Sequence, residues 1–452
     1  MSAKITFIGA GSFGFTRTVL KDVLTFPRLA DAEIALMDID PERLDMSREC
    51  CQRIIDAGGY KARLKTYTNR RRALDGANAV IVTILSGDTD IWQHDILIPK
   101  KYGVDICIGD TRGPSGIFRA LRTIPVMLSI CKDMQEVCPD AIMLNYTNPM
   151  AMLCHAMQTV YPQLTISGLC HSVQGTANML AQWLGKTEQD MDYVSAGLNH
   201  MSWLIKYEYQ SRDMYPKLRK LVQTREDIYY QSRVRNDMFL MLGYYITEGS
   251  RHNSEYSWWF RKRPDLIKYY FTKKAPESGR DGSNAWLVKM YQRRKQTWRK
   301  ELRDWINHPD WSDPAKTAER LKRGNEYASS IVNAWTGGET YTFHGNVPNH
   351  GVITNLPQGA CIEVPVVARR RRLQTVHVGD LPKSVLSLTA LTANNEMLAV
   401  EGALKKDARM IYQAIAYDPL TAAVLSLPEI KKMTMEMFAK NKKYLPGFKS
   451  NL

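Results

Sequence analysis

The feature that most constrains the fold is a glycine-rich loop directly after the first apolar run of the chain. Residues 5–8 (ITFI) predict a buried strand, and residues 9–14 (GAGSFG) follow it before a helical stretch. Glycines at this spacing permit a tight turn and bring backbone N–H groups close to a pyrophosphate at a helix N-terminus. The loop therefore predicts a dinucleotide-binding α/β domain at the start of the chain.

Further short apolar runs alternate with helical stretches through the first third of the chain. The predicted strands after the first are residues 33–37, 79–85, 141–144 and 165–169. Unbroken apolar runs between helices are typical of parallel strands that are covered on both faces. With right-handed crossovers they form a Rossmann-like, doubly wound parallel sheet.

The second predicted strand ends in Asp38-Ile39-Asp40. An acidic residue at this position binds the ribose hydroxyls and disfavours a 2′-phosphate, so NAD is preferred over NADP. The predicted cofactor-binding residues are Gly9, Gly11, Ser12, Phe13 and Asp38.

The character of the sequence changes near residue 190. Residues 210–330 are rich in charge and aromatic side chains and predict helices, residues 336–357 predict loops and short strands, and residues 386–445 predict helices again. We expect an NAD-binding domain over residues 1–190. We expect residues 191–452 to form a mixed α+β, largely helical part for substrate binding, metal binding and oligomerisation.

Composition excludes several classes of protein. No apolar run reaches the ~18 residues of a membrane span, and the first residues lack the pattern of a secretory signal. None of the eight cysteines forms a C-x-x-C pair, which favours a reduced, cytoplasmic setting. The net charge of +15 comes from short, dispersed basic runs, so it indicates a solvated surface and not a nucleic-acid site.

Polar clusters follow the predicted strands, where ligands bind in open parallel sheets. Among them, Cys170 and His200 offer a thiolate and an imidazole, which suit a divalent transition metal. Two protein ligands leave coordination positions open, as a catalytic metal requires. On spacing alone, however, a cysteine and a histidine 30 residues apart are more often unrelated. The five clusters are residues 86–88, 109–114, 145–149, 170–173 and 197–200.

Taken together, these motifs resemble glycoside hydrolase family 4 in order along nearly the whole chain. The segment Cys170-His171-Ser172-Val173 resembles the bacterial α-galactosidase branch of that family. The matching motifs are residues 9–12, 37–40, 109–114, 143–149, 170–173, 197–200, 355–357 and 363–365.

The resemblance implies a lactate or malate dehydrogenase-like fold and an α-glycoside substrate. It places a metal, typically Mn²⁺, on Cys170 and His200, a substrate contact on Asn148 and the proton donor on His171. Phosphosugar enzymes of the family carry an arginine where Trp92 lies here, which argues against a phosphorylated substrate. A homodimer or homotetramer is expected by the same analogy.

The family's mechanism is an NAD-dependent exception to two-carboxylate glycoside hydrolysis. It implies hydride transfer from C3 to NAD, deprotonation at C2, elimination of the aglycone with a proton from His171, addition of water and reduction of the ketone. A bound metal stabilises the enediolate as a Lewis acid. Asp110 is expected to act as a second acid or base, or to position water. The C2 base stays open between Tyr245 and Tyr256.

The resemblance leaves alternatives for the substrate. Arg251 lies where the α-galactosidases tend to have glutamate, so an α-galacturonidase or α-glucuronidase stays open, with Arg251 binding substrate, as does an α-glucosidase. An NAD-dependent 2-hydroxy acid dehydrogenase is the alternative from another class of enzyme. It would bind no metal and would accumulate NADH. A non-enzymatic NAD-binding protein is a further alternative, against which the many polar strand ends argue.

Overall fold

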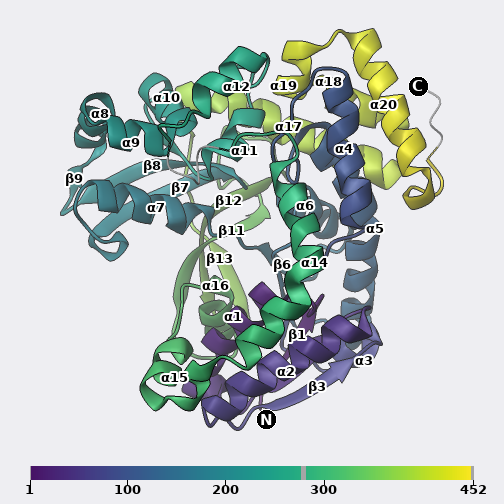
Figure 1. Cartoon of the computed structure of the whole chain (residues 1–452), viewed down its shortest axis with the longest axis vertical. Helices are drawn as coiled ribbons and strands as arrows, with labels where there is room; N and C mark the ends of the chain where they lie inside the picture. Colours follow the sequence, from purple (N-terminus) through teal and green to yellow (C-terminus); the bar gives the residue numbers. More distant parts are fainter. Residues whose placement is uncertain (1, 276–280, 449–452) are drawn as a thin grey trace.

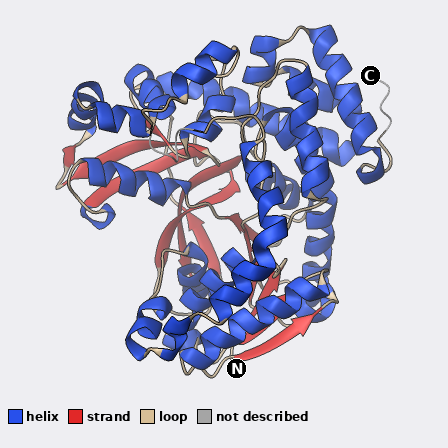
Figure 2. Ribbon diagram, in the orientation of Figure 1, coloured by secondary structure: helices blue, strands red, loops and turns tan. Residues whose placement is uncertain are grey.

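The computed structural model describes residues 2–275 and 281–448, and their strands form one continuous 13-stranded sheet (Figures 1 and 2). The half that contains the N-terminal strand is parallel, with strand order β3-β2-β1-β4-β5-β6. This order confirms the predicted Rossmann-like sheet. Its strands are β1 (Lys4–Ile8), β2 (Glu33–Met37), β3 (Arg63–Tyr67), β4 (Ala79–Val82), β5 (Ile142–Asn145) and β6 (Thr165–Gly168).

Alternate residues of these strands pack into two separate hydrophobic clusters, one on each face of the sheet. Ile5 and Phe7 contact the cluster that includes helices α1 and α2, whereas Ile8 contacts the cluster with α4, α5 and α6. The parallel sheet is therefore doubly wound. The helices of this half are α1 (Phe13–Leu24), α2 (Pro41–Ala57), α3 (Arg70–Leu74), α4 (Thr89–Lys101), α5 (Gly113–Val137), α6 (Met150–Val160) and α7 (Ser172–Trp183), with the 3₁₀ turns η1 (Pro27–Leu29) and η2 (Glu188–Asp190).

The second half of the chain adds antiparallel strands to the same sheet. Strand β11 joins β6 through Asn346 and Gly168, and β12 joins β7 through Glu363 and Gly197. Since the sheet runs through both halves, the second half is not a detachable module; the boundary at residue 190 stays a prediction. The added strands are β7 (Met191–Leu198), β8 (Met201–Tyr209), β9 (Arg212–Asp213), β10 (Tyr245–Ile246), β11 (Tyr341–Pro348), β12 (Cys361–Arg369) and β13 (Arg372–Thr375).

Most of the remaining chain is helical, as predicted. The C-terminal helices pack beside α4, α5 and α6 (Figure 1), and within the described ranges no helix is long and apolar enough to cross a membrane. The helices are α8 (Tyr215–Thr224), α9 (Glu226–Gln231), α10 (Arg233–Leu242), α11 (Ser250–Glu255), α12 (Pro264–Tyr270), α14 (Trp286–Ile306), α15 (Pro314–Leu321), α16 (Tyr327–Trp335), α17 (Lys383–Lys405), α18 (Ala408–Ala416), α19 (Pro419–Val424) and α20 (Leu427–Asn441), with the 3₁₀ turns η3 (Pro309–Ser312) and η4 (Lys442–Tyr444).

Candidate active site

The glycine loop connects β1 to α1 at the carboxyl edge of the parallel strands. The Gly11 amide donates to Asp38 Oδ2 at 2.7 Å, which ties the loop to the end of β2. Helix α1, which is fully described, has neither a side-chain cap at Ser12 nor an acidic residue in its first turn. Its first N–H groups are therefore available to an anion. Phe13 opens the helix and stacks on Trp298 of α14 at 5.1 Å.

Cys170 and His200 come together as the strand-end argument requires. Cys170 lies two residues past β6, and His200 occupies the turn between β7 and β8. Cys170 Sγ is 3.2 Å from His200 Nε2, and Glu248 Oε2 is 3.5 Å from the same nitrogen. The donor atoms of these three residues all lie within 4.8 Å of one another. They form a trio of thiol, imidazole and carboxylate, which we call the donor trio.

The sequence analysis missed Glu248. The residue follows β10, a two-residue strand that was not predicted, so its strand-end position was hidden. Its backbone has a φ of +67°, a conformation that non-glycine residues rarely adopt. Such strain is typical of functional positions.

A hydrogen-bond chain sets the tautomer of His200. The Thr111 hydroxyl donates to Asp110 Oδ1 at 2.7 Å and lies 2.9 Å from His200 Nδ1. Because the hydroxyl has a single proton, His200 Nδ1–H must donate to it, which leaves a lone pair on Nε2. That lone pair faces the other two members of the donor trio, as in metal sites whose histidine ligands are oriented by a second hydrogen bond.

Asp110 and His252 lie next to His200. Asp110 Oδ1 is 3.6 Å from His252 Nε2, while His252 Nδ1 is 3.3 Å from Glu248 Oε1. Burial opposes a charge on His252, but the Glu248 and Asp110 carboxylates raise its pKa to about 9. Burial lowers the pKa of His200 to about 4, so this imidazole is neutral, the form that binds a metal. His252, like Glu248, was not singled out as a site residue from the sequence.

Asn148 and Arg119 present polar atoms at the same place. Asn148 Nδ2 donates to Asp110 Oδ2 at 3.0 Å, and Arg119 Nε donates to the Asn148 carbonyl at 3.0 Å. Asn148 Oδ1 and Arg119 Nη1 are buried and have no hydrogen-bond partner among the described residues. Because buried polar groups in proteins are nearly always paired, these two atoms are available for a polar ligand. Trp92 stacks under Arg119 at 4.4 Å.

His171 lies at the start of α7, beside Cys170. Its Nε2 is 2.8 Å from Glu326 Oε2, and the same carboxylate oxygen accepts a hydrogen bond from Tyr146 at 3.0 Å. The sequence analysis did not select Glu326, which lies 155 residues further along the chain in the region expected to be helical.

The structure separates the two tyrosines proposed as bases. Tyr245 is fully buried in a hydrophobic cluster and donates to Asn236 Oδ1 at 2.8 Å, because the alternation of β10 turns it into that cluster. The structure therefore does not bring Tyr245 to the donor trio. Tyr256 lies closer to the donor trio. Its ring centroid is 6.2 Å from that of His252, which contacts Glu248, and 4.8 Å from the Arg112 guanidinium.

Arg251, the expected substrate residue, turns toward the segment that begins at residue 281. Its guanidinium stacks on Trp286 at 3.9 Å and donates to the Asp281 carbonyl at 2.8 Å. A substrate carboxylate would have to compete with both contacts.

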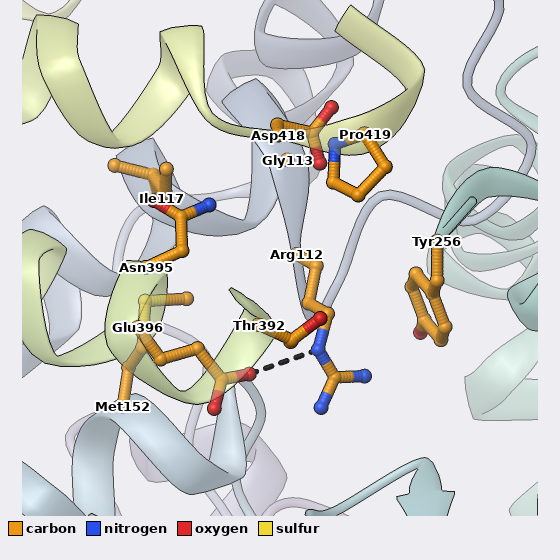
Figure 3. A pocket seen from close by; sticks show the side chains of 10 residues that line it. All are labelled: Arg112, Gly113, Ile117, Met152, Tyr256, Thr392, Asn395, Glu396, Asp418 and Pro419. Atoms are coloured by element: carbon orange, nitrogen blue, oxygen red, sulfur yellow. Dashed lines mark ion pairs between the residues drawn. The ribbon is translucent and has the colours of Figure 1, made fainter. Parts of the chain in front are cut away.

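Arg112 connects a loop of the site to α17, and Figure 3 shows its ion pair with Glu396. Arg112 Nη2 donates to the Asn199 carbonyl at 2.5 Å, directly before His200, and Arg112 Nε is 2.9 Å from Glu396 Oε1 on α17. Both partners of this ion pair are buried. The small pocket beside the pair is lined by Arg112, Gly113, Ile117, Met152, Tyr256, Thr392, Asn395, Glu396, Asp418 and Pro419.

We expect Glu396→Ala to lower the free energy of unfolding by about 3–5 kcal/mol, because it leaves the Arg112 charge buried without its carboxylate. Chemical denaturation measures the change. Glu401→Ala on the same helix is the matched control, since its pair with Lys405 is exposed and contributes at most about 1 kcal/mol. Equal losses of unfolding free energy in the two variants would mean that the buried ion pair of Arg112 and Glu396 does not stabilise the fold.

Comparison with known proteins decides the family. The model of the family 4 glycosyl hydrolases matches residues 4–186, and the model of their C-terminal domain matches residues 195–421. The chain belongs to glycoside hydrolase family 4. It is therefore a glycoside hydrolase, as the motifs predicted, and the dehydrogenase alternative is set aside.

Several relatives are similar over their full length. An α-galactosidase of Bacillus subtilis is 38% identical, covering 99% of this chain and 100% of that protein. An α-galactosidase of Rhizobium meliloti is 36% identical over 99% and 90% of the two chains. An α-galacturonidase of Thermoanaerobacterium saccharolyticum is 30% identical over 98% and 97%.

Solved structures confirm the fold of this family 4 hydrolase. The structure of the Bacillus subtilis protein lplD, described as a glucosidase, has a TM-score of 0.84 at 26% identity and covers 96% of this chain and 99% of its own. A 6-phospho-α-glucosidase from gut microorganisms, solved with NAD and Mn²⁺, has a TM-score of 0.76 at 17% identity and covers 99% and 100%. Lactate dehydrogenase of Eimeria maxima, at 14% identity over 89% and 96% with a TM-score of 0.51, shares the fold alone.

Proposed function

We propose that this enzyme hydrolyses α-galactosides in a reaction that depends on NAD and a divalent metal. One observation carries the proposal: the donor trio lies beside Asn148 and Asp110, among the strand ends of a sheet that also carries the glycine loop. The full-length similarity to two α-galactosidases supports the choice of sugar.

The residues fit both cofactors. Cys170, Glu248 and the free lone pair of His200 Nε2 would hold the metal, and Mn²⁺ is present in a related structure. The glycine loop would bring a pyrophosphate to the uncapped N-terminus of α1, and Asp38 would bind the ribose. When bound, NAD supplies a hydride acceptor and the metal supplies Lewis acidity toward the sugar oxygens.

The chain's own residues supply positioning and proton transfer. Asn148 Oδ1 and Arg119 Nη1 orient the sugar hydroxyls, and His171 protonates the glycosidic oxygen. Burial and the nearby Asp110 carboxylate raise the pKa of Tyr256, which keeps its phenol protonated. Although burial opposes its charge, Asp110 stays ionised because the hydrogen bond to His252 and the charge of His252 lower its pKa. The same lowering makes Asp110 a weak proton acceptor, so the C2 base stays open between Asp110 and Tyr256.

A neutral glycone fits the surroundings of the site better than an anionic one. The Arg251 guanidinium is already held by Trp286 and Asp281, and Trp92 donates its indole N–H to the Gly109 carbonyl. An α-galacturonide is the second candidate, because relatives with that activity are similar over nearly the whole chain. The cytoplasmic location and the homodimer or homotetramer stay predictions.

The test is the release of p-nitrophenol from five α-linked glycosides: galactoside, glucoside, galacturonide, glucuronide and 6-phosphoglucoside. Each is assayed with and without NAD, Mn²⁺ and a thiol reductant. We expect hydrolysis of the galactoside that disappears when NAD or Mn²⁺ is omitted. Hydrolysis confined to a uronide would keep the cofactors and overturn the proposed sugar. Hydrolysis that persists without NAD and metal would overturn the proposal as a whole.

A further inference from the structure

Glu326 connects two parts of the site from a distant part of the chain. Its Oε2 lies 2.8 Å from His171 Nε2 and 3.0 Å from the Tyr146 hydroxyl. The Glu326 side chain is only 11% exposed, whereas that of His171 is 44% exposed. The carboxylate therefore faces the protein, and the imidazole has one side open to a substrate.

The segment that carries Glu326 is itself anchored. Asp22, which is fully buried on α1, accepts hydrogen bonds from the backbone N–H groups of Gly324 at 2.8 Å and Glu326 at 3.3 Å. These bonds fix the chain where it enters α16. The position of the carboxylate is therefore set by backbone contacts and not by the histidine alone.

Two aromatic rings fix the plane of the imidazole. The ring centroids of Phe15 and Tyr146 lie 6.2 and 6.0 Å from that of His171, with planes tilted by 25° and 26°. Stacking on Phe15 and Tyr146 sets the plane of the His171 ring, and the contact of Nε2 with Glu326 sets the orientation of the ring within that plane. With Nε2 occupied, Nδ1 is the ring nitrogen left for a substrate.

We propose that Glu326 is a positioning residue that holds His171 with Nδ1 directed at the leaving oxygen, and that the enzyme is thereby built for aglycones that are poor leaving groups, such as sugars and alkyl alcohols. The inference extends the proposed function, in which His171 is the proton donor. A carboxylate that orients a histidine and fixes its tautomer is a recurrent arrangement in catalysis.

The step balances without a further reactant. The acid is the imidazolium form of His171, whose Nε2–H stays on Glu326. Its Nδ1 proton moves to the glycosidic oxygen as the C1–O bond breaks, the aglycone leaves as a neutral alcohol, and the neutral imidazole keeps its Nε2 proton. The electron pair of the C2–H bond becomes the C1–C2 double bond, and the C2 proton passes to the base. A nitrophenolate leaves with little protonation of its oxygen, because it is a stable anion. A sugar alkoxide is a poor leaving group and must be protonated as it leaves.

The test compares two substrates in Glu326→Gln. With melibiose, whose leaving group is a sugar alcohol, we expect kcat/KM to fall about 10²–10³-fold, the usual contribution of a general acid. With p-nitrophenyl α-galactoside we expect a change of less than about 3-fold, because little proton transfer is lost. Most of the loss should appear in kcat. Glu319→Gln on α15 is the matched control, since Glu319 is exposed and pairs only with Lys322 among the described residues.

Equal losses on the two substrates would overturn the proposal, because a purely structural defect does not distinguish leaving groups. Should the wild-type enzyme cleave uronides instead, the same comparison with nitrophenyl and alkyl uronides decides the role of Glu326 although the proposed sugar has failed. A second readout needs no activity: ¹⁵N NMR of the neutral imidazole, assigned with His171→Asn. We expect a proton on Nε2 of His171 and a mixture of tautomers in Glu326→Gln. A wild-type proton on Nδ1 would overturn the proposal.

Discussion

Replacing Cys170 by serine is expected to lower the affinity for Mn²⁺ by more than about 100-fold and to abolish hydrolysis at micromolar metal. Loss of a residue that only orients a ligand already costs 10- to 100-fold, so loss of a ligand should cost more. Cys170 Sγ is 3.2 Å from His200 Nε2, whose lone pair is free. A serine hydroxyl does not ionise at neutral pH, so it cannot replace the thiolate as a ligand. Titration followed by the electron paramagnetic resonance of free Mn²⁺ measures the affinity directly.

The surroundings of the wild-type Cys170 thiol favour the binding of a cation. Burial raises the pKa of Cys170, and the Glu248 and Glu363 carboxylates raise it further. A divalent ion between Cys170 and Glu248 would reverse this effect by stabilising the thiolate. Metal binding is therefore expected to release a proton, which calorimetry in buffers of different ionisation enthalpy detects.

Cys138→Ser provides the matched control for the thiol. Cys138 is also a free cysteine, but it caps α5 in a hydrophobic cluster and does not belong to the donor trio. We expect it to bind Mn²⁺ like the wild type. Wild-type affinity in Cys170→Ser would remove Cys170 from the ligand set, and the activity assay would then show whether the thiol serves the reaction in another way.

The parallel half of the sheet was predictable because burial on both faces gives a strand a continuous apolar sequence. Strands β1, β2, β4 and β5 follow this rule. The edge strand β3 does not: its five residues include Arg63 and Lys65, and all five are exposed or half-exposed. An edge strand needs no apolar run, so the pattern that found the others could not find it.

Site residues were predictable where they follow such a strand. Asn148 follows β5, and Cys170 and His171 follow β6, whereas Asp110 lies in the loop between α4 and α5. All four lie at or beside the donor trio. Residues from the second half were harder to predict, since a two-residue strand and irregular helices place them. Glu248, His252 and Glu326 are examples. Tyr245 shows the opposite error: it was chosen as one of several neighbouring tyrosines, and the alternation of a short strand buries it.

Gly9→Ala is expected to weaken NAD binding by at least about tenfold and to lower the melting temperature by several degrees. Gly9 has a φ of +85°, and a Cβ there would lie 2.4 Å from the Thr83 carbonyl oxygen. The left-handed conformation alone costs a non-glycine residue about 1–2 kcal/mol. Relief of the clash must move a loop whose Gly9 and Ala10 amides both donate to the Met37 carbonyl at 3.0 Å.

The matched control for folding is Gly14→Ala, in the first turn of α1. A Cβ on Gly14 meets nothing within 4 Å and its φ is not positive, so we expect no fall in melting temperature. Titration of NAD by intrinsic fluorescence and thermal unfolding without NAD separate the two effects of Gly9→Ala. Stability lost with unchanged NAD affinity would mean that the turn serves only the fold. Wild-type values for both would contradict the geometry of the loop, because no alanine fits against Thr83 without movement of the backbone that is to hold the pyrophosphate.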